Sequence, residues 1–234
     1  ATLVAAGRLI WDQAQSGQLF VLGSQGVEDA LIALWLAQGH HLPPRRPAAA
    51  AKGPIAIVSG SCSPQTDCQI AVADAQGFAT FALDLTRATT PSEVTQVTES
   101  VVISAQQALD RGQSVVIHSA RGPNDPALAA TRALAQRLAQ PALVETVLGT
   151  ILVRLYQQAR LQRCAVAGGD TSGTVTTALG AVALTAEAEI VPAVPLLHVH
   201  FAALDRAPLE LVLKGGQMGP ENLFPMIRDG IAGS

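Results

Sequence analysis

One local unit recurs along this sequence and constrains its fold more than any other feature. In each copy, a short apolar run passes into a turn rich in glycine and hydroxyl residues and then into a helical pattern. Short apolar runs bounded by turn residues are typical of buried strands, whereas apolar residues spaced three and four apart are typical of helices. Strands that alternate with helices favour an α/β fold with a mainly parallel sheet and helices on both faces.

The pattern places eight strands and at least seven helices along the chain. The predicted strands are Leu19–Leu22, Ile55–Val58, Phe78–Leu83, Ser114–His118, Cys164–Ala167, Val182–Thr185, Leu196–Phe201 and Leu209–Leu213. The predicted helices cover the N-terminal segment and stretches that begin near residues 27, 64, 91, 127, 143 and 171. Ser63 followed by Pro64 indicates a capped helix start, and Thr90 with Glu93 forms the pattern of a capping box.

Four of the predicted turns follow the carboxyl end of a predicted strand. They are Gly23–Gly26, Ser59–Ser63, Ser119–Asp125 and Gly168–Gly173. In a parallel sheet these ends lie along one edge, which is where ligands bind in α/β proteins. We therefore expect strand–turn–helix units to line one edge of the sheet and to form a single site there.

Composition argues against several classes of protein. The 234 residues carry a net charge of −3 and only 3% aromatic residues, which disfavours a general nucleic-acid binder. Apolar runs such as Ala178–Leu184 fall short of the roughly 20 residues that cross a bilayer, and the first residues lack the pattern of a secretory signal. The three cysteines form no paired framework, which favours a reducing, cytoplasmic setting.

The turn Gly168–Gly173, with the sequence GGDTSG, is the strongest candidate for a ligand site. Its glycines allow the backbone to approach a ligand closely, and the following helix directs unpaired amides and a positive dipole end toward it. Thr171 and Ser172 add hydroxyl donors, and Asp170 could cap the helix or orient a metal-bound water. A phosphate site and a plain helix start packed through glycine both fit this pattern, which is neither GxxxxGK[ST] nor GxGxxG.

Other candidates are weaker on local grounds. Lys214 precedes the turn Gly215–Gly219 and could neutralise phosphate charge, although a turn with a solvated lysine fits equally well. Ser61 does not fit the GxSxG pattern of a nucleophile elbow, so its hydroxyl is better interpreted as a hydrogen-bond donor. His198 and His200 share a face of one strand but are too few for a typical zinc site, and His118 is read as a core histidine.

Five ordered motifs together resemble a known family. They are GSQGVEDAL at 23–31, IVSGSCSPQTDCQI at 57–70, GQSVVIHSARGP at 112–123, AVAGGDTSG at 165–173 and LVLKGGQMG at 211–219. The chain resembles the C-terminal nucleotide-binding domain of the four-carbon sugar-acid kinases, which use ATP to phosphorylate 3-oxo-tetronate, D-threonate or D-erythronate. The resemblance implies a transferase of carbohydrate metabolism with ATP and Mg²⁺ as cofactors. It predicts the nucleotide-binding residues Ser61, Gly168, Gly169, Asp170, Thr171, Ser172, Gly173, Lys214, Gly215, Gly216 and Gly219, with Asp170 in the outer shell of the metal and no direct metal ligand.

The chain departs from this family in length. Its members are about twice as long and begin with a domain that carries a D-D-x-T-G motif and binds the sugar acid, whereas this sequence contains no Asp-Asp pair. We therefore expect residues 1–18 to be the end of a preceding domain or linker and residues 19–234 to be the nucleotide-binding domain. The acceptor site and general base would be missing, so the fragment alone is expected to be inactive. A non-catalytic nucleotide-sensing or scaffolding module and a homo-oligomer are both compatible with the sequence.

Overall fold

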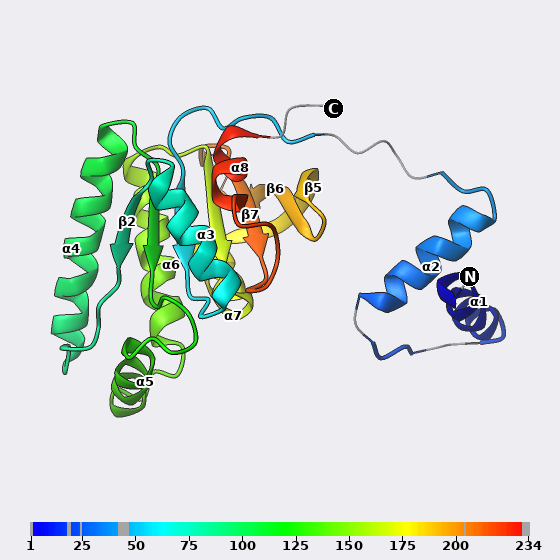
Figure 1. The fold of residues 1–234 in the computed structure, drawn as a ribbon, viewed down its shortest axis with the longest axis horizontal. Coiled ribbons are helices and arrows are strands. Elements are labelled where there is room, and N and C mark those ends of the chain that lie inside the picture. Colours follow the sequence, from blue (N-terminus) through cyan, green and yellow to red (C-terminus); the bar gives the residue numbers. More distant parts are fainter. Residues whose placement is uncertain (1, 18–19, 24, 42–46, 204, 231–234) are drawn as a thin grey trace. The chain divides into compact units, whose positions relative to one another are not determined.

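The computed structural model describes residues 2–17, 20–23, 25–41, 47–203 and 205–230 (Figure 1). The chain divides into two compact units, residues 1–45 and 46–234. The sequence prediction drew its boundary after residue 18, so the structure assigns one more helix to the first unit than expected. That residues 1–18 end a preceding domain stays a prediction.

The first unit is a pair of helices, α1 (Thr2–Gln15) and α2 (Gly26–Ala37). They approach closely because Gly7 has no side chain: a Cβ there would lie 2.1 Å from the carbonyl oxygen of Ala30. The rings of Trp11 and Trp35 meet edge to face with their centroids 5.6 Å apart. This pair of contacts joins the two helices into one unit.

The predicted strand at 19–22 is wrong for its described residues 20–22, which adopt no strand. Phe20 and Leu22 are 96% and 103% exposed, so this apolar run has no neighbouring strand to bury it. Residue 19 lies outside the described residues, as does residue 24 of the predicted turn Gly23–Gly26. That turn leads into α2 of the first unit and follows no strand of the sheet, so it is not the fourth sheet-edge turn that the sequence predicted.

The second unit contains a seven-stranded sheet in the order β2-β3-β1-β4-β7-β6-β5. The first five strands of that order run parallel, and β6 and β5 continue the sheet antiparallel. The predicted α/β fold with a mainly parallel sheet is confirmed, and the antiparallel hairpin is an addition to it. The strands are β1 (Ala56–Ser59), β2 (Ala79–Ala82), β3 (Val115–His118), β4 (Arg163–Ala167), β5 (Ala181–Val191), β6 (Val194–Phe201) and β7 (Glu210–Lys214).

Helices cover both faces of this sheet, as predicted (Figure 1). One face packs against α4, α6 and α7, and the other packs against α3 and α8. The helices are α3 (Pro64–Ala75), α4 (Pro91–Asp110), α5 (Ala127–Arg137), α6 (Leu143–Gln158), α7 (Gly169–Leu179) and α8 (Leu223–Asp229). Both predicted caps form: Ser63 accepts from the Thr66 amide at the start of α3, and Thr90 and Glu93 complete a capping box at the start of α4.

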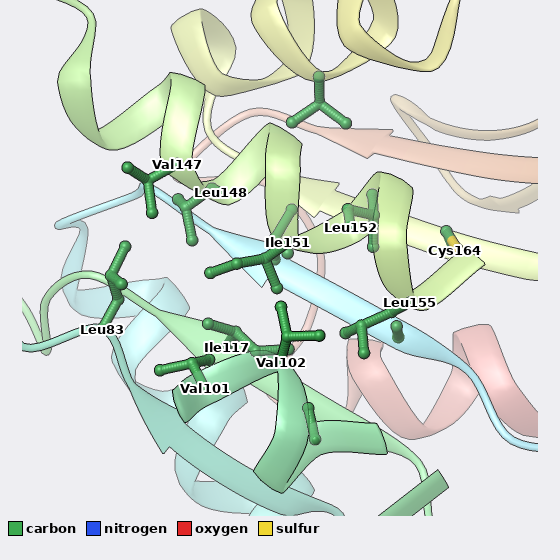
Figure 2. Packing of buried hydrophobic residues seen from close by; sticks show 14 of the residues in the cluster. Leu83, Val101, Val102, Ile117, Val147, Leu148, Ile151, Leu152, Leu155 and Cys164 are labelled. Carbon is green, nitrogen blue, oxygen red and sulfur yellow. The ribbon is translucent and has the colours of Figure 1, made fainter. Parts of the chain in front are cut away.

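The larger core lies between the sheet and helices α4 and α6. Figure 2 shows Leu148, Ile151 and Leu155 of α6 lying over Val102 of α4 and Ile117 of β3. Strands β1, β3 and β4 are buried along their whole length, as expected of central parallel strands covered on both faces. The core therefore holds the carboxyl ends of these strands in fixed positions.

A buried arginine forms an ion pair where strands β4 and β7 begin, at the edge of the sheet away from their carboxyl ends. The Arg163 side chain is 1% exposed and pairs with Glu210 of the neighbouring strand at 2.7 Å. The same guanidinium donates to the carbonyl oxygens of Ala49 and Ile227 at 2.9 and 2.8 Å. This arginine links the segment before β1 and helix α8 to the sheet. Among the described residues, no helix is both long and apolar enough to cross a membrane.

Candidate functional site

Four parallel strands end at the same level of the sheet. Ser59 of β1 is in register with His118 of β3 on one side and with Ala167 of β4 on the other, and Ala167 is in register with Lys214 of β7. The turns that follow these strands therefore start side by side. Three of the four turns predicted to meet are there, and the turn after β7 takes the place of Gly23–Gly26.

Backbone hydrogen bonds continue between these turns beyond the strands. The Gly60 amide donates to the Ala167 carbonyl at 3.0 Å, and the Gly168 amide donates to the Lys214 carbonyl at the same distance. The first residues of these two turns are thus held by the sheet ladder. The site is built on rigid backbone at its base.

The helices that follow β1 and β4 cover opposite faces of the sheet. Helix α3 after β1 packs on one face, and α7 after β4 packs on the other. Neighbouring strands whose connections separate in this way leave a crevice at their carboxyl ends, which is where ligands bind in open α/β sheets. Both helices also begin at this crevice, so their positive dipole ends lie at it. The first amides of α7 are free to face it, whereas α3 begins with Pro64, which has no N–H, and its Thr66 amide donates to Ser63.

A cavity of about 430 Å³ lies in this crevice. Its wall combines the turns after β1, β3, β4 and β7 with one residue of α6. It is lined by Gly60, Ser61, Cys62, Ser63, Pro64, Pro123, Glu145, Gly168, Gly169, Asp170, Thr171, Gly216 and Gln217. Six of the predicted nucleotide-binding residues line it: Ser61, Gly168, Gly169, Asp170, Thr171 and Gly216.

The glycines at this cavity have different physical roles. A Cβ on Gly60 would lie 2.1 Å from Thr171 Oγ1, and one on Gly216 would lie 2.9 Å from Ser61 Oγ. Gly168 has a φ of +124°, which an L side chain rarely adopts. These three positions let the turns pack against one another. A Cβ on Gly169 would meet nothing within 4 Å, so this glycine leaves open space at the start of α7.

The segment predicted as a turn at Gly168–Gly173 is mostly helix. Only Gly168 lies outside α7, which begins at Gly169, two residues earlier than the sequence predicted. Ser172 turns its hydroxyl back to the Gly168 carbonyl at 2.6 Å, and Gly173 lies inside the helix. Neither residue is among those that line the cavity. The part of this motif that lines the cavity is therefore its start, from Gly168 to Thr171.

Three hydroxyl side chains connect the turn after β1 to the turn after β7. Thr66 Oγ1 lies 3.0 Å from Ser61 Oγ and 2.9 Å from the Gly216 carbonyl oxygen. Ser63 Oγ also donates to that carbonyl. Ser61 lies at the cavity end of this network.

Lys214 does not project into the cavity. Its ammonium donates to Thr66 Oγ1 at 2.8 Å, to Gln69 Oε1 at 2.7 Å and to the Gly216 carbonyl at 3.1 Å. These three bonds occupy its three donors. The interpretation of Lys214 as a solvated turn residue is wrong, because its side chain is buried.

Gly215 and Gly219, the other residues of this turn that were predicted to bind nucleotide, contribute to its packing. The carbonyl of Gly219 accepts from the Gln65 and Gln69 side-chain amides, and a Cβ on Gly219 would lie 2.6 Å from the Leu223 side chain. A Cβ on Gly215 would lie 3.3 Å from Met218 Cγ. Gly215 and Gly219 are not among the residues that line the cavity.

The charged groups at the cavity wall are carboxylates. Asp170 and Glu145 line it, and its described lining includes no lysine or arginine. Within the part of the chain that the structure describes, no three His, Cys, Asp or Glu side chains group as metal ligands would. The groups that could attract an anion here are therefore the two helix starts and Lys214, which is buried next to the turn after β7.

The histidines lie apart from the lining residues. His118 is buried at the end of β3, where burial and then Arg121 lower the pKa of its imidazole. Its Nδ1 has no hydrogen-bond partner within the described structure. His198 and His200 meet edge to face on β6. The interpretation of His118 as a core residue is consistent with its burial.

Comparison with known proteins places this site in a family. The family model described as the nucleotide-binding C-terminal domain matches residues 56–224, from the start of β1 to α8. The chain belongs to this family. The nucleotide-binding C-terminal domain thus includes all four turns that meet at the cavity, and the resemblance to sugar-acid kinases is confirmed.

Curated proteins similar to this chain include kinases that act on 3-oxo acids by name. The chain is 44% identical to a 3-oxo-isoapionate kinase of Paraburkholderia graminis over 98% of its own length and 50% of that protein. It is 31% identical to a 3-oxo-tetronate kinase of Cupriavidus necator over 92% of its length and 50% of that protein. A Haemophilus influenzae crystal structure shares the fold with a TM-score of 0.67 at 21% identity, covering 97% of this chain and 51% of the other. The chain spans about half the length of the curated relatives it matches.

Sequence reasoning missed the helix residues that organise this nucleotide-binding domain. Thr66 and Gln69 of α3 are both fully buried and bond to the turn after β7. Their signal is visible in retrospect: with Ser63 they are spaced three apart, so polar residues occupy the inward face of a helix. Glu145 of α6 carried no such signal, because its place at the cavity depends on how α6 packs.

Proposed function

We propose that this chain is the ATP-binding half of a kinase that phosphorylates a sugar acid. The observation that carries the proposal is the meeting of two helix starts, α3 and α7, at one cavity whose wall at Gly169 is open. Unpaired amides at helix starts favour phosphate, and a position without a side chain lets a phosphate reach them. The match to the nucleotide-binding domain family supports a nucleotide as the ligand that carries this phosphate.

The cavity wall fits the triphosphate end of a nucleotide. The amides at the start of α7 and the Ser61 hydroxyl would donate to phosphate oxygens, and Gly216 would form the facing wall. Asp170 and Glu145 offer the carboxylate oxygens that hold hydrated Mg²⁺, which is commonly bound through one or two carboxylates and the phosphates themselves. Bound Mg²⁺ would supply charge neutralisation during phosphoryl transfer, for which positioning matters more than covalent chemistry.

We propose a four-carbon sugar acid or a related 3-oxo acid as the phosphate acceptor. The names of the relatives, 3-oxo-isoapionate kinase and 3-oxo-tetronate kinase, support this substrate class. The acceptor site would be formed by a second domain like the one that makes up the other half of those relatives, so residues 1–234 alone would bind nucleotide and transfer no phosphate. The unpaired cysteines favour the cytoplasm as the place of this reaction.

Calorimetric titration with Mg·ADP and Mg·ATP tests the nucleotide site. We expect saturable binding with one nucleotide per chain and much weaker binding of adenosine, since the phosphates make the proposed contacts. No heat of binding at millimolar Mg·ADP would overturn the proposal. Glu187→Gln, on the exposed edge strand β5, serves as a control that should bind like the wild type.

A complementation assay tests the kinase reaction. The N-terminal half of the Paraburkholderia graminis relative is expressed separately and mixed with this chain, and ADP release is measured with 3-oxo-isoapionate or 3-oxo-tetronate. We expect turnover with the mixture and none with either part alone. Nucleotide binding without turnover in the mixture, or in a chain joined to that half, would instead favour a nucleotide sensor.

A further inference from the structure

The Lys214 ammonium is a buried cation without an anionic partner among the described residues. The residue is 2% exposed, and its three hydrogen bonds go to a hydroxyl, an amide oxygen and a backbone carbonyl. The Phe224 ring of α8 lies 6.0 Å from its nitrogen. A buried ammonium normally has a carboxylate partner, because the loss of hydration is otherwise only partly compensated.

The charged groups on the surrounding elements are directed elsewhere. On α3, Asp67 pairs with Arg121, and Asp74 accepts a hydrogen bond from Thr80. On α8, Arg228 pairs with Asp229, and on the strands Arg163 pairs with Glu210. Asp170, at the start of α7, is exposed at the cavity. None of these carboxylates forms an ion pair with Lys214 in the described structure. The charge that would balance this ammonium is therefore to be sought in a ligand.

A chain of hydroxyls leads from Lys214 to the cavity. The ammonium donates to Thr66 Oγ1, so the Thr66 proton points away from it, toward Ser61 Oγ or Ser63 Oγ, each at 3.0 Å, or toward the Gly216 carbonyl. Where Ser61 Oγ accepts that proton, its own proton is left for a weak 3.3 Å bond to Ser63 or for a ligand. The lysine thus orients a donor at the cavity wall without reaching the cavity itself.

We infer that Lys214 is a positioning residue whose buried charge is balanced by the nucleotide's phosphates. It acts through Thr66 and Ser61 and, at alkaline pH, takes up a proton from solvent when the nucleotide binds. This inference rests on the proposed nucleotide site. It assigns Lys214 a role through the hydroxyl chain, in place of the direct phosphate contact that its position beside a glycine-rich turn suggested.

The direction of proton exchange follows from the pKa of Lys214 in the free and in the nucleotide-bound protein. Burial lowers the pKa of Lys214 from its ordinary value to about 8. Phosphate charge at the cavity favours the protonated amine and so raises that pKa. Below pH 7 the amine is protonated in both states and no proton is exchanged, whereas above pH 8 the free protein is partly deprotonated and binding draws a proton in.

The sequence allows a direct measurement, because it contains only two lysines, Lys52 and Lys214. Protein labelled with ¹³Cε-lysine gives two signals, which Lys52→Met assigns. We expect the Lys214 signal to titrate near pH 8 in the free protein and at least about one pH unit higher with saturating Mg·ADP, while exposed Lys52 stays unchanged. If Lys214 titrates at the same pH with and without bound nucleotide, the inference is overturned and the nucleotide site stands. If no nucleotide binds, both fail.

Calorimetry at pH 8.5 in buffers of different ionisation enthalpy counts the protons taken up. We expect more than about half a proton per nucleotide for the wild type and for Lys52→Met, and none for Lys214→Met. Thr66→Val removes the hydroxyl link and should weaken Mg·ADP binding roughly tenfold with adenosine binding unchanged, whereas Thr66→Ser should restore it. Undiminished Mg·ADP binding by a folded Thr66→Val variant would contradict action through the hydroxyl chain.

Discussion

Thr171 Oγ1 occupies the space that a side chain on Gly60 would need. A Cβ on Gly60 would lie 2.1 Å from that oxygen and 3.3 Å from Thr171 Cβ. Thr171 is itself buried in the first turn of α7. The two turns that follow β1 and β4 therefore fit together only because one of them has no side chain at this position.

Gly60→Ala should destabilise the protein. The added methyl group must displace a buried threonine, and overpacking of this kind typically costs about 1–3 kcal/mol. Urea unfolding followed by circular dichroism measures the loss. Gly173→Ala is the matched control: it lies in α7, a Cβ there meets nothing within 4 Å, and alanine is favoured in a helix by about 0.5–1 kcal/mol. Equal stability of the two variants would contradict this packing.

Gly169→Ala should separate binding from stability. A Cβ at this position meets no atom within 4 Å, so we expect the free energy of unfolding to change by less than about 0.5 kcal/mol. The same methyl group would project into the space through which a phosphate reaches the amides of α7, so Mg·ADP binding should weaken at least about tenfold. Calorimetry on Gly169→Ala and on the control Gly173→Ala checks this. An unchanged affinity of Gly169→Ala for Mg·ADP would place the phosphates elsewhere.

The sheet could be predicted from the sequence because its signals are local. Strands β1, β3 and β4 are apolar runs followed by a glycine or serine, Ser63 marks the start of α3 after β1, and Thr90 marks the start of α4 after β2. The run at 19–22 shows the same local pattern and forms no strand where it is described. A strand requires a neighbour, which no local pattern supplies.

The site was predictable where backbone chemistry determines it and not where packing does. Glycines at 168, 169 and 216 carry a signal in the sequence, and all three line the cavity. Lys214 has an equally clear signal beside Gly215, yet its ammonium turns inward to Thr66 and Gln69. The direction of a long side chain depends on which acceptors the neighbouring helix offers, and this becomes known only from the fold.

Arg163→Met should destabilise the protein strongly. Its buried guanidinium pairs with Glu210, which is partly exposed, and donates to two backbone carbonyls, so the substitution removes several hydrogen bonds to a charged group, each worth about 1.5–3 kcal/mol. Arg154→Met is the control, because its pair with Glu99 lies at the surface, where such pairs contribute little. Urea midpoints measure both variants. Similar midpoints would mean that Arg163 does not link the sheet to α8 as the structure indicates.

The three cysteines should react with a thiol reagent in two classes. Cys62 and Cys68 are exposed, whereas Cys164 is buried in β4, where burial raises the pKa of its thiol to about 12. Since the thiolate is the reactive form, Ellman's reagent at pH 8 should modify Cys62 and Cys68 in the native protein and Cys164 only after unfolding. Rapid reaction of Cys164 would show that β4 opens far more readily than its burial implies.

Bound nucleotide should slow the reaction of Cys62 with the thiol reagent and leave that of Cys68 unchanged. Cys62 lines the cavity, whereas Cys68 lies further along α3 and is not among the lining residues. With Cys68→Ala, saturating Mg·ADP should slow the reaction of Cys62 at least about tenfold, because the ligand would cover the sulfur. With Cys62→Ala, the reaction of Cys68 should keep its rate. Equal effects of Mg·ADP on both thiols would point to a global change in the protein, and no effect on Cys62 would place the nucleotide outside this cavity.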